Sequence, residues 1–381
     1  MLSQDELVND FDLGDLFKAY FDCRKNKRTT HSALEFELDL EKNLLLLYKE
    51  LKNGTYEIGK CICFVVTRPK PREVWAANFR DRIVHHLVYN AIKNRFYKRF
   101  IKDTYSCIPE RGTLAAANRL LHFTRSATQN YTKKMYYLKA DLSNFFVSID
   151  KDILFALLQK YVVEDWLLKL LKQIIYHDPR TNVYRKSPPY LYNLIPPYKS
   201  LWNSDNLHGL PIGNLTSQFF SNVYLNVLDQ FVKRKLKCKY YVRYVDDFII
   251  IYDNPKSLNR FFELINIHLQ THLKLKLHPC KKLINTVTQG INFVGFFLLP
   301  DRILLRKRTL NKIRHCILRW QSRFNPYGSR YLEEFFRSIN SYFGMMVNLK
   351  SFNLRFYFAS MVNSLFIFPD CSFSKCCVGR L

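Results

Sequence analysis

Residues 240–252 read YYVRYVDDFIIIY, and this stretch decides the fold. Runs of β-branched and aromatic residues, which favour strands, lie on both sides of the adjacent carboxylates Asp246 and Asp247. The pattern predicts a buried β-hairpin with both acids at its tip. Two such charges are costly to place together unless a cation joins them, and carboxylate oxygens are ligands that magnesium prefers. An Asp-Asp pair alone is more often a solvated turn.

A second apolar run, farther upstream, favours the metal. Residues 138–146 read LKADLSNFF, a strand pattern that reaches Asp141. Three carboxylates on two neighbouring strands predict a site for two Mg²⁺ ions, one activating a 3′-hydroxyl and the other neutralising a triphosphate leaving group. Asp141, Asp246 and Asp247 are therefore the predicted catalytic acids and metal ligands.

At this point the sequence resembles a reverse transcriptase. The Tyr-Val-Asp-Asp box matches the palm hairpin of that family, and Asp141 followed by Phe146 matches the strand that supplies the first metal ligand and the sugar gate. Residues 209–218, GLPIGNLTSQ, resemble the template and nucleotide helix. Residues 281–282, two lysines, and 290–296, GINFVGF, resemble the late palm lysine and the primer grip.

The resemblance covers roughly residues 15–350 and implies an α+β fold with the right-hand architecture of polymerases. It implies fingers, a palm in which an antiparallel sheet packs on helices, and a helical thumb. The implied domains are an N-terminal helical segment at 1–56, fingers at 57–134, a palm at 135–300 with a fingers or insertion segment at about 155–206, and a helical thumb with a C-terminal tail at 301–381.

The resemblance also implies a role for each site residue. Asp141 and Asp246 would bridge the two magnesium ions, with Asp247 assisting. Leu142 completes the implied metal-binding set, and Mn²⁺ could replace Mg²⁺. Lys281 would stabilise the leaving pyrophosphate, but the adjacent Lys282 suits that role equally well. The implied nucleotide-binding residues are Lys70, Arg72, Phe146 and Gln218, and the implied primer and template residues are Tyr244, Ile212, Gly213 and Gly295.

Several of these residues also have ordinary structural interpretations. Lys70 and Arg72 lie on a basic turn, and either could be a solvated surface charge. Phe146 could be a core side chain, because Phe145 is adjacent and only one of the two can face the site on a strand.

The remaining elements follow from periodicity and turn residues. The sequence predicts helical structure over 1–56, a strand over 56–67, helices over 78–100, 151–161, 213–228 and 257–273, a strand over 273–277, and a basic helix from residue 301 onward. Ser148 and Asp150 are predicted helix caps. Residues 176–206 form a Pro- and Tyr-rich insertion, to which the sequence assigns no role.

Composition agrees with a nucleic-acid partner. The 381 residues contain 59 Lys and Arg against 32 Asp and Glu, a formal net charge of +27 that suits a polyanion. Aromatic residues make up 15%, which suits base stacking. A basic solvated surface or a membrane-binding face would show the same excess, but no apolar run reaches membrane-spanning length.

The ten cysteines show no zinc-site spacing, and the N-terminus lacks the pattern of a signal peptide. Reduced structural thiols in a cytoplasmic protein are therefore expected. The resemblance implies that the protein is bacterial or phage-encoded.

The turn at residues 211–218, PIGNLTSQ, resembles most closely the reverse transcriptases of diversity-generating retroelements. Ile212 stands where retroviral members have Gln. The resemblance implies error-prone cDNA synthesis on a structured non-coding RNA with a small basic accessory protein, and it is compatible with an oligomer. An antiphage-defence reverse transcriptase with unusual priming or templating is the main alternative. A retron-type enzyme fits less well, because its Asn-Ala-x-x-His and Val-Thr-Gly blocks are not intact. A non-catalytic RNA-binding protein on the same scaffold is the alternative from another class.

Overall fold

The structure is a computed structural model, and it describes residues 10–25, 30–323, 329–347, 349 and 351–363. Two compact units make up the chain. Unit 1 comprises Met1–Pro109, Lys139–Phe248 and Asn259–Lys282, and unit 2 comprises Glu110–Leu138, Ile249–Leu258 and Leu283–Leu381. Neither unit is a continuous stretch of sequence, because the chain passes from one to the other several times.

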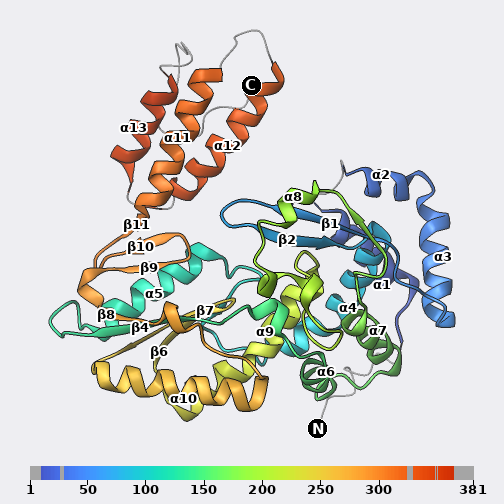
Figure 1. The fold of residues 1–381 in the computed structure, drawn as a ribbon, viewed down its shortest axis with the longest axis horizontal. Coiled ribbons are helices and arrows are strands. Elements are labelled where there is room, and N and C mark those ends of the chain that lie inside the picture. Colours follow the sequence, from blue (N-terminus) through green and yellow to red (C-terminus); the bar gives the residue numbers. More distant parts are fainter. Residues whose placement is uncertain (1–9, 26–29, 324–328, 348, 350, 364–381) are drawn as a thin grey trace. The chain divides into compact units, whose positions relative to one another are not determined.

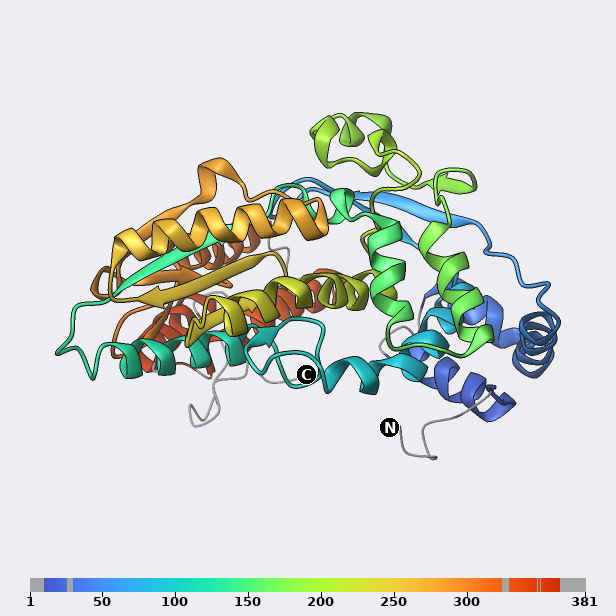
Figure 2. The same ribbon diagram turned by 90° about the horizontal axis from the view of Figure 1, so that it is seen from below.

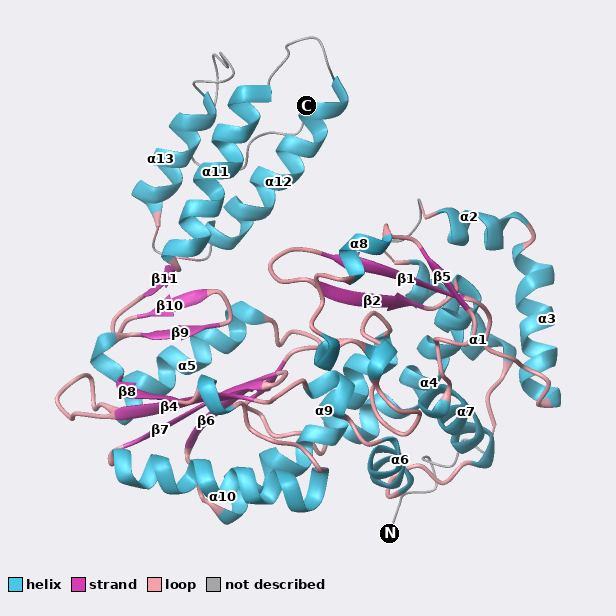
Figure 3. Ribbon diagram, in the orientation of Figure 1, coloured by secondary structure: helices cyan, strands magenta, loops and turns pink. Residues whose placement is uncertain are grey.

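The helices and strands are labelled in Figure 1 and coloured by type in Figure 3. In chain order they are α1 (Leu13–Arg24), α2 (His31–Leu38), α3 (Leu40–Asn53), β1 (Cys61–Val66), β2 (Arg72–Ala76), α4 (Phe79–Tyr97), β3 (Thr104–Tyr105), α5 (Thr113–Ala127), β4 (Tyr136–Asp141), α6 (Lys151–Gln159), α7 (Asp165–Tyr176), β5 (Val183–Arg185), α8 (Pro189–Tyr192), α9 (Leu215–Gln230), β6 (Tyr240–Tyr244), β7 (Asp247–Tyr252), α10 (Pro255–Leu273), β8 (Leu283–Thr286), β9 (Ile291–Phe293), β10 (Phe296–Leu298), β11 (Ile303–Leu305), α11 (Lys307–Arg323), α12 (Ser329–Val347) and α13 (Phe352–Asn363).

Unit 1 begins with helices whose ends the sequence specifies. Asp12 caps α1 by accepting a hydrogen bond from the Asp15 backbone N–H, and Asp15 returns the interaction in a capping box. Helix α3 ends at Gly54, which adopts a φ of 70° that glycine tolerates best. Helix α4 packs against α1 and α9, and its buried face joins theirs in one apolar core.

A three-stranded sheet in unit 1 has the order β2-β1-β5. Strands β1 and β2 form an antiparallel hairpin around the basic turn, with Cys63 opposite Trp75. Strand β5, from the 176–206 insertion, adds to the other edge of β1 in parallel, with Ile62 opposite Tyr184. The hairpin that carries Lys70 and Arg72 therefore has a partner from a distant part of the sequence.

A five-stranded sheet has the order β3-β6-β7-β4-β8, and strands β4 and β7 run through both units. The apolar run of β7 is buried, as its sequence predicts. Asp141 is the last residue of β4, and Asp246 lies in the turn between β6 and β7. Neighbouring positions of β4 and β7 in the sheet bring the ends of both strands together.

Unit 2 contains the sheet β11-β10-β9, against which α5 packs, and the helices α11, α12 and α13. Helix α11 contacts both α12 and α13. The C-terminal tail predicted within 301–381 lies outside the described residues from residue 364 onward. None of the helices in the described part of the chain is long and apolar enough to cross a membrane.

Four predictions of local structure are wrong in part. Residues 273–277 show the expected alternating burial, but they form only an isolated bridge, from Leu277 to Leu142, and no strand. Strand β4 ends at Asp141 as predicted, but the strand alternation expected for Phe145 and Phe146 is wrong, because Asn144 turns the chain with a φ of 47° into a 3₁₀ helix, Phe145–Ser148. Ser148 therefore lies in that helix, and Asp150 alone caps α6. The basic helix predicted from residue 301 begins only at Lys307.

Candidate active site

A network of buried polar side chains supports the β6–β7 hairpin. The Arg243 guanidinium and the Asp229 carboxylate are both fully buried, and they form two parallel hydrogen bonds, Nε to Oδ1 and Nη2 to Oδ2, each 2.7 Å long. Tyr241 Oη donates to Oδ1 at 2.7 Å, and Thr104 Oγ1 donates to Oδ2 at 2.6 Å. Burial by itself would lower the pKa of Arg243, but the Asp229 carboxylate outweighs it and raises that pKa.

The same arginine reaches the turn that carries Asp246. Arg243 Nη1 donates to the Val245 carbonyl at 2.7 Å. Val245 has a φ of 55°, in the left-handed region that β-branched residues rarely adopt. A strained conformation of this kind persists only where neighbouring contacts fix it. The buried arginine supplies such a contact, so the Asp229 network fixes the backbone that presents Asp246.

Asp246 and Asp141 lie close enough to affect each other. Although Asp246 keeps some exposed surface, burial raises its pKa to about 7, and the nearby Asp141 and Asp247 carboxylates add to the shift. One Asp141 carboxylate oxygen, Oδ1, is buried and accepts no hydrogen bond from any residue that the structure describes. Two crowded carboxyl groups, one with an unsatisfied oxygen, are chemically suited to a cation.

Lysines lie beside the other carboxylate oxygens. The His278 backbone N–H donates to the Asp141 carbonyl at 2.8 Å, and the following 3₁₀ turn places the Lys281 ammonium on Asp141 Oδ2. Lys139, two residues before Asp141 on β4, forms an ion pair with Asp247 Oδ2 at 3.0 Å. Asp141 and Asp247 are thus each paired with a lysine.

The structure distinguishes the two adjacent lysines that the sequence could not. Lys282 forms an ion pair with Glu263 at 3.5 Å, and its ammonium lies 4.2 Å from the centroid of the Phe262 ring. Of these two lysines, Lys281 lines the same pocket as Asp246 and Lys282 does not.

The aspartates have the chemistry of divalent-cation ligands, but they do not form a complete coordination shell. In the described part of the chain, no three His, Cys, Asp or Glu side chains are grouped so that they could hold a metal ion. The unsatisfied oxygen of Asp141 and the raised pKa of Asp246 nevertheless match hard oxygen ligands that a cation would join. Asp141 and Asp246 are therefore the ligands that the geometry supports best.

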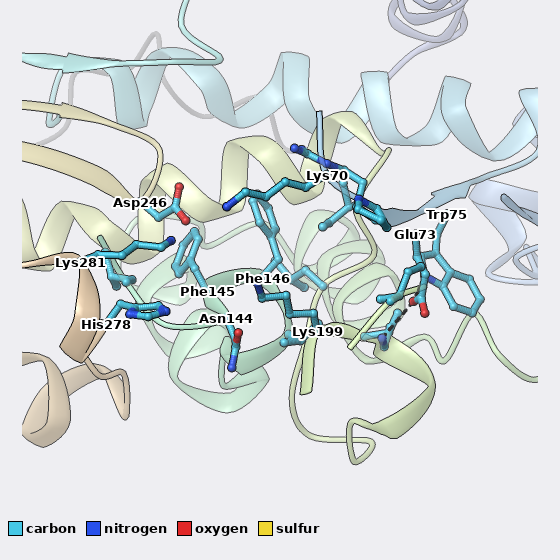
Figure 4. A pocket seen from close by; sticks show the side chains of 18 residues that line it. Lys70, Glu73, Trp75, Asn144, Phe145, Phe146, Lys199, Asp246, His278 and Lys281 are labelled. Carbon is cyan, nitrogen blue, oxygen red and sulfur yellow. Dashed lines mark hydrogen bonds between the residues drawn. The ribbon is translucent and has the colours of Figure 1, made fainter. Parts of the chain in front are cut away.

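A pocket of about 270 Å³ in unit 1 brings many of the predicted residues together (Figure 4). Its lining includes Lys70, Arg72, Leu142, Phe146, Ile212, Asp246 and Lys281. Phe145 also lines it, so the 3₁₀ turn places both rings at the pocket, where a strand would have placed one. Phe145 is 2% exposed, whereas Phe146 is half-buried.

The other predicted residues do not line this pocket. Gln218 is exposed on α9 and accepts a hydrogen bond from the Cys107 thiol at 3.3 Å. Tyr244 is half-buried at the end of β6. Gly213 has a φ of 132°, and a Cβ there would lie 2.8 Å from the Trp75 carbonyl oxygen, so glycine is needed. Gly295 belongs to unit 2, in the turn between β9 and β10.

The sequence reasoning missed three groups of residues. Lys139 has a simple signal, since residues i and i+2 of a strand share a face and Asp141 follows at that spacing. Asp229 lies in the otherwise uncharged helix α9, and Arg243 lies in the otherwise uncharged strand β6. A charge buried in either element needs a partner of opposite charge. Lys199 also lines the pocket, but it comes from an insertion with no recognisable pattern.

Comparison with known proteins agrees with these motifs. A family model described as reverse transcriptase (RNA-dependent DNA polymerase) matches residues 68–298, more than half of the chain. No curated protein matches the sequence.

Among solved structures, telomerase from Candida albicans in complex with a TWJ fragment of telomeric RNA is similar at 12% identity and a TM-score of 0.46, covering 82% of this chain and 60% of that one. Apo telomerase from Candida tropicalis, truncated from its C-terminal domain, is similar at 12% identity and a TM-score of 0.45, covering 69% of this chain and 59% of that one. The chain thus spans about three fifths of the length of both telomerase chains.

The family match and the mixed helix and sheet structure confirm the predicted α+β fold class with right-hand polymerase architecture. The predicted boundaries of fingers, palm and thumb remain predictions. The chain belongs to the reverse transcriptase family, the RNA-dependent DNA polymerases.

Proposed function

We propose that this protein copies an RNA template into DNA by nucleotidyl transfer. The observation that carries the proposal is the meeting of Asp141 and Asp246 beside a pocket lined by Lys70, Arg72 and Phe146. Phosphoryl transfer needs in-line positioning and charge neutralisation more than covalent help from the protein. The acidic group of Asp246, the basic groups of Lys70 and Arg72 and the aromatic ring of Phe146 suit those needs.

The position of each residue supports the part that we propose for it. Lys70 and Arg72 hold the phosphates of the incoming nucleotide, and Phe146 lies against its sugar and disfavours a 2′-hydroxyl. Lys281, beside Asp141, stabilises the charge that develops on the leaving pyrophosphate. Reverse transcriptases generally use divalent metals, and here Asp141 and Asp246, with Asp247 and Leu142, would hold Mg²⁺, or Mn²⁺ in its place, to neutralise the triphosphate and activate the 3′-hydroxyl.

The test is deoxynucleotide incorporation by the purified full chain on a primed RNA template with Mg²⁺. We expect incorporation by the wild type and its loss in Asp246→Asn. Asp253→Asn is the matched control, because Asp253 lies in an exposed ion pair with Lys133 at 3.6 Å. Equal activity in wild type and Asp246→Asn would favour contamination, and RNA binding without incorporation by any variant would favour a non-catalytic RNA-binding protein.

We further propose that synthesis is error-prone, as in a diversity-generating retroelement. Ile212 supports this, because it lines the pocket with an apolar side chain while its carbonyl accepts a hydrogen bond from the Trp75 N–H at 2.7 Å. An apolar residue there gives no polar check on the pairing nucleotide. A structured non-coding RNA and a small basic accessory protein are the proposed partners.

Sequencing the products of wild type and Ile212→Gln on one RNA tests this subtype. Errors concentrated opposite adenine in the wild type, and fewer errors in Ile212→Gln, are expected. Equal error rates in the two proteins would instead favour the antiphage-defence alternative, for which untemplated or protein-primed products are the direct evidence.

A further inference from the structure

The insertion at 176–206 is built onto the β1–β2 hairpin. Besides the β1–β5 pairing, the Lys186 N–H donates to the Cys63 carbonyl at 2.8 Å, and Tyr192 Oη donates to the same carbonyl at 2.8 Å. The Val65 N–H donates to Ser187 Oγ at 3.0 Å. In Figure 2 the green loops of the insertion lie along the blue strands of the hairpin. Main-chain bonds therefore fix the insertion in register with the hairpin.

A buried carboxylate anchors the part of the insertion that is nearest the pocket. Glu73, on β2, is 5% exposed, and its oxygens accept hydrogen bonds from three donors. They are Ser200 Oγ, the Leu201 N–H at 3.0 Å and Trp75 Nε1 at 3.1 Å. A buried charge left without such donors would be strongly destabilising. The acid thus ties residues 200–201 to the hairpin.

Lys199 immediately precedes this anchor. It ends a 3₁₀ turn, Pro197–Lys199, in which the Lys199 N–H donates to the Pro196 carbonyl at 2.8 Å. Two adjacent prolines restrict the backbone of that turn. Lys199 forms no ion pair with any described residue, and its ammonium lies 5.5 Å from the centroid of the adjacent Tyr198 ring. Its backbone is fixed while its charge is available.

The Lys199 side chain lines the same pocket as Lys70, Lys281 and Asp246. In Figure 4 the side chains of Lys70, Lys199 and Lys281 extend towards the space around Phe145 and Phe146. The three lysines come from three separate elements, and the pocket lining holds more cations than anions, since Glu73 and Asp246 are its only acids among the described residues. This charge balance suits a triphosphate.

We infer that Lys199 is a further nucleotide-binding residue, and that the insertion forms one wall of the nucleotide site. Its ammonium group contacts phosphate oxygens of the incoming nucleoside triphosphate, alongside Lys70. The inference rests on the proposed polymerase function. An ammonium–phosphate contact at the pocket mouth strengthens binding of the nucleotide without taking part in bond formation, so it acts on KM for the nucleotide more than on kcat.

The test compares wild type, Lys199→Ala, Lys199→Arg and Lys186→Ala. Lys186 is the matched control, because it is an exposed lysine of the same insertion that does not line the pocket. Losing one charge-assisted hydrogen bond should raise the nucleotide KM of Lys199→Ala about 10-fold, and kcat should stay within about 2-fold. Lys199→Arg should restore most of the affinity and Lys186→Ala should match wild type. The KM difference should shrink at high salt.

Template affinity and nucleotide binding separate the outcomes. A weaker template Kd with an unchanged nucleotide KM in Lys199→Ala would overturn the inference and assign Lys199 to RNA. Wild-type incorporation with an unchanged KM would overturn it while leaving the polymerase intact. Calorimetric binding of deoxyadenosine triphosphate with Ca²⁺ covers the remaining case. If the wild type incorporates no nucleotide but binds deoxyadenosine triphosphate, and Lys199→Ala binds it more weakly, the inference is supported and the proposed function is overturned.

Discussion

Two acidic sites contact the β6–β7 hairpin, Asp229 from helix α9 and Asp141 with Asp246 at its turn, and they are opposites. The Asp229 carboxylate is fully buried, and four donors from Arg243, Tyr241 and Thr104 satisfy both its oxygens. Asp141 and Asp246 lie near each other, with a buried oxygen unsatisfied and one pKa raised to about 7. The first cluster is electrostatically complete and the second is not.

The difference separates residues that support the hairpin from the residues that we propose take part in catalysis. A complete buried network resists change and fixes the Val245 turn. Carboxylates that lack enough positive partners remain able to bind a cation. The hairpin thus joins a rigid support to the proposed catalytic tip, and mutations should separate the two roles.

The largest effect should follow from Asp246→Asn. Incorporation should fall on the order of 10³-fold, a large loss for removing a single group that organises transition-state charge. The melting temperature should stay the same or rise, because the substitution removes a crowded negative charge. Thermal melts beside the incorporation assay check this, and a fall in melting temperature would place Asp246 with the supporting residues.

Arg243→Met should act in the opposite way, on stability first. It leaves the Asp229 charge buried without its main partner, which should lower the free energy of unfolding by about 3–5 kcal/mol. Urea unfolding measures this loss. Lys282→Met is the control, because an exposed pair such as Lys282–Glu263 contributes at most about 1 kcal/mol.

A double variant sharpens the same point. Replacing Asp229 by Leu together with Arg243→Met removes both buried charges, so part of the stability should return. The double variant should still synthesise DNA poorly, since the Val245 carbonyl has lost its donor. Full recovery of synthesis would show that the network does not position the turn.

Lys281→Ala should lower kcat about 10²-fold, within the range for a group that transfers or stabilises a proton at the leaving atom. Lys282→Ala should stay within about 2-fold of wild type, because Lys282 faces Glu263 and Phe262. Steady-state kinetics on one template compare the two. Equal losses would mean that the pairing of Lys281 with Asp141 is not decisive.

The smallest effect is a pH dependence of stability. In EDTA, the Asp246 carboxyl keeps its proton up to about pH 7 in the folded chain but only to its ordinary pKa, 3.8, when unfolded. Between these values the folded state binds more protons, so the contribution of Asp246 to stability falls as pH rises. The stability advantage of Asp246→Asn should widen from pH 4 to 7 and then level off. A constant difference would show that Asp246 is not perturbed.

The sequence predicted best where local pattern and burial coincide. Residues 240–252 alternate between apolar runs and two acids, so the hairpin and its tip follow directly. Helix α10 was predicted at 257–273 and spans Pro255–Leu273. The prediction is close because the apolar periodicity of this segment is long. The motif residues gathered at the pocket come from the family resemblance, which sets their order and spacing.

The rest depended on contacts that a single sequence does not contain. Alternating burial at residues 273–277 cannot tell a strand from an extended segment, since only hydrogen-bond partners make the difference. The φ of 47° at Asn144 changed the orientation of Phe145 and Phe146 without an obvious signal. The roles of Asp229 and Lys199 depend on partners far away in the sequence, so neither could be predicted from its neighbours.

The interleaving of the two units has a consequence for the order of events during synthesis on the ribosome. Unit 1 draws its last segment from Asn259–Lys282, which includes the lysine beside Asp141. Translation at about 5–20 residues per second delays that segment by roughly 15–55 s after initiation. The early helices must wait for it, and a nascent chain interrupted before residue 281 carries Asp141 without the Lys281 ammonium that pairs with it. Neither unit can be excised as one contiguous fragment, so dissection by truncation should yield aggregating pieces.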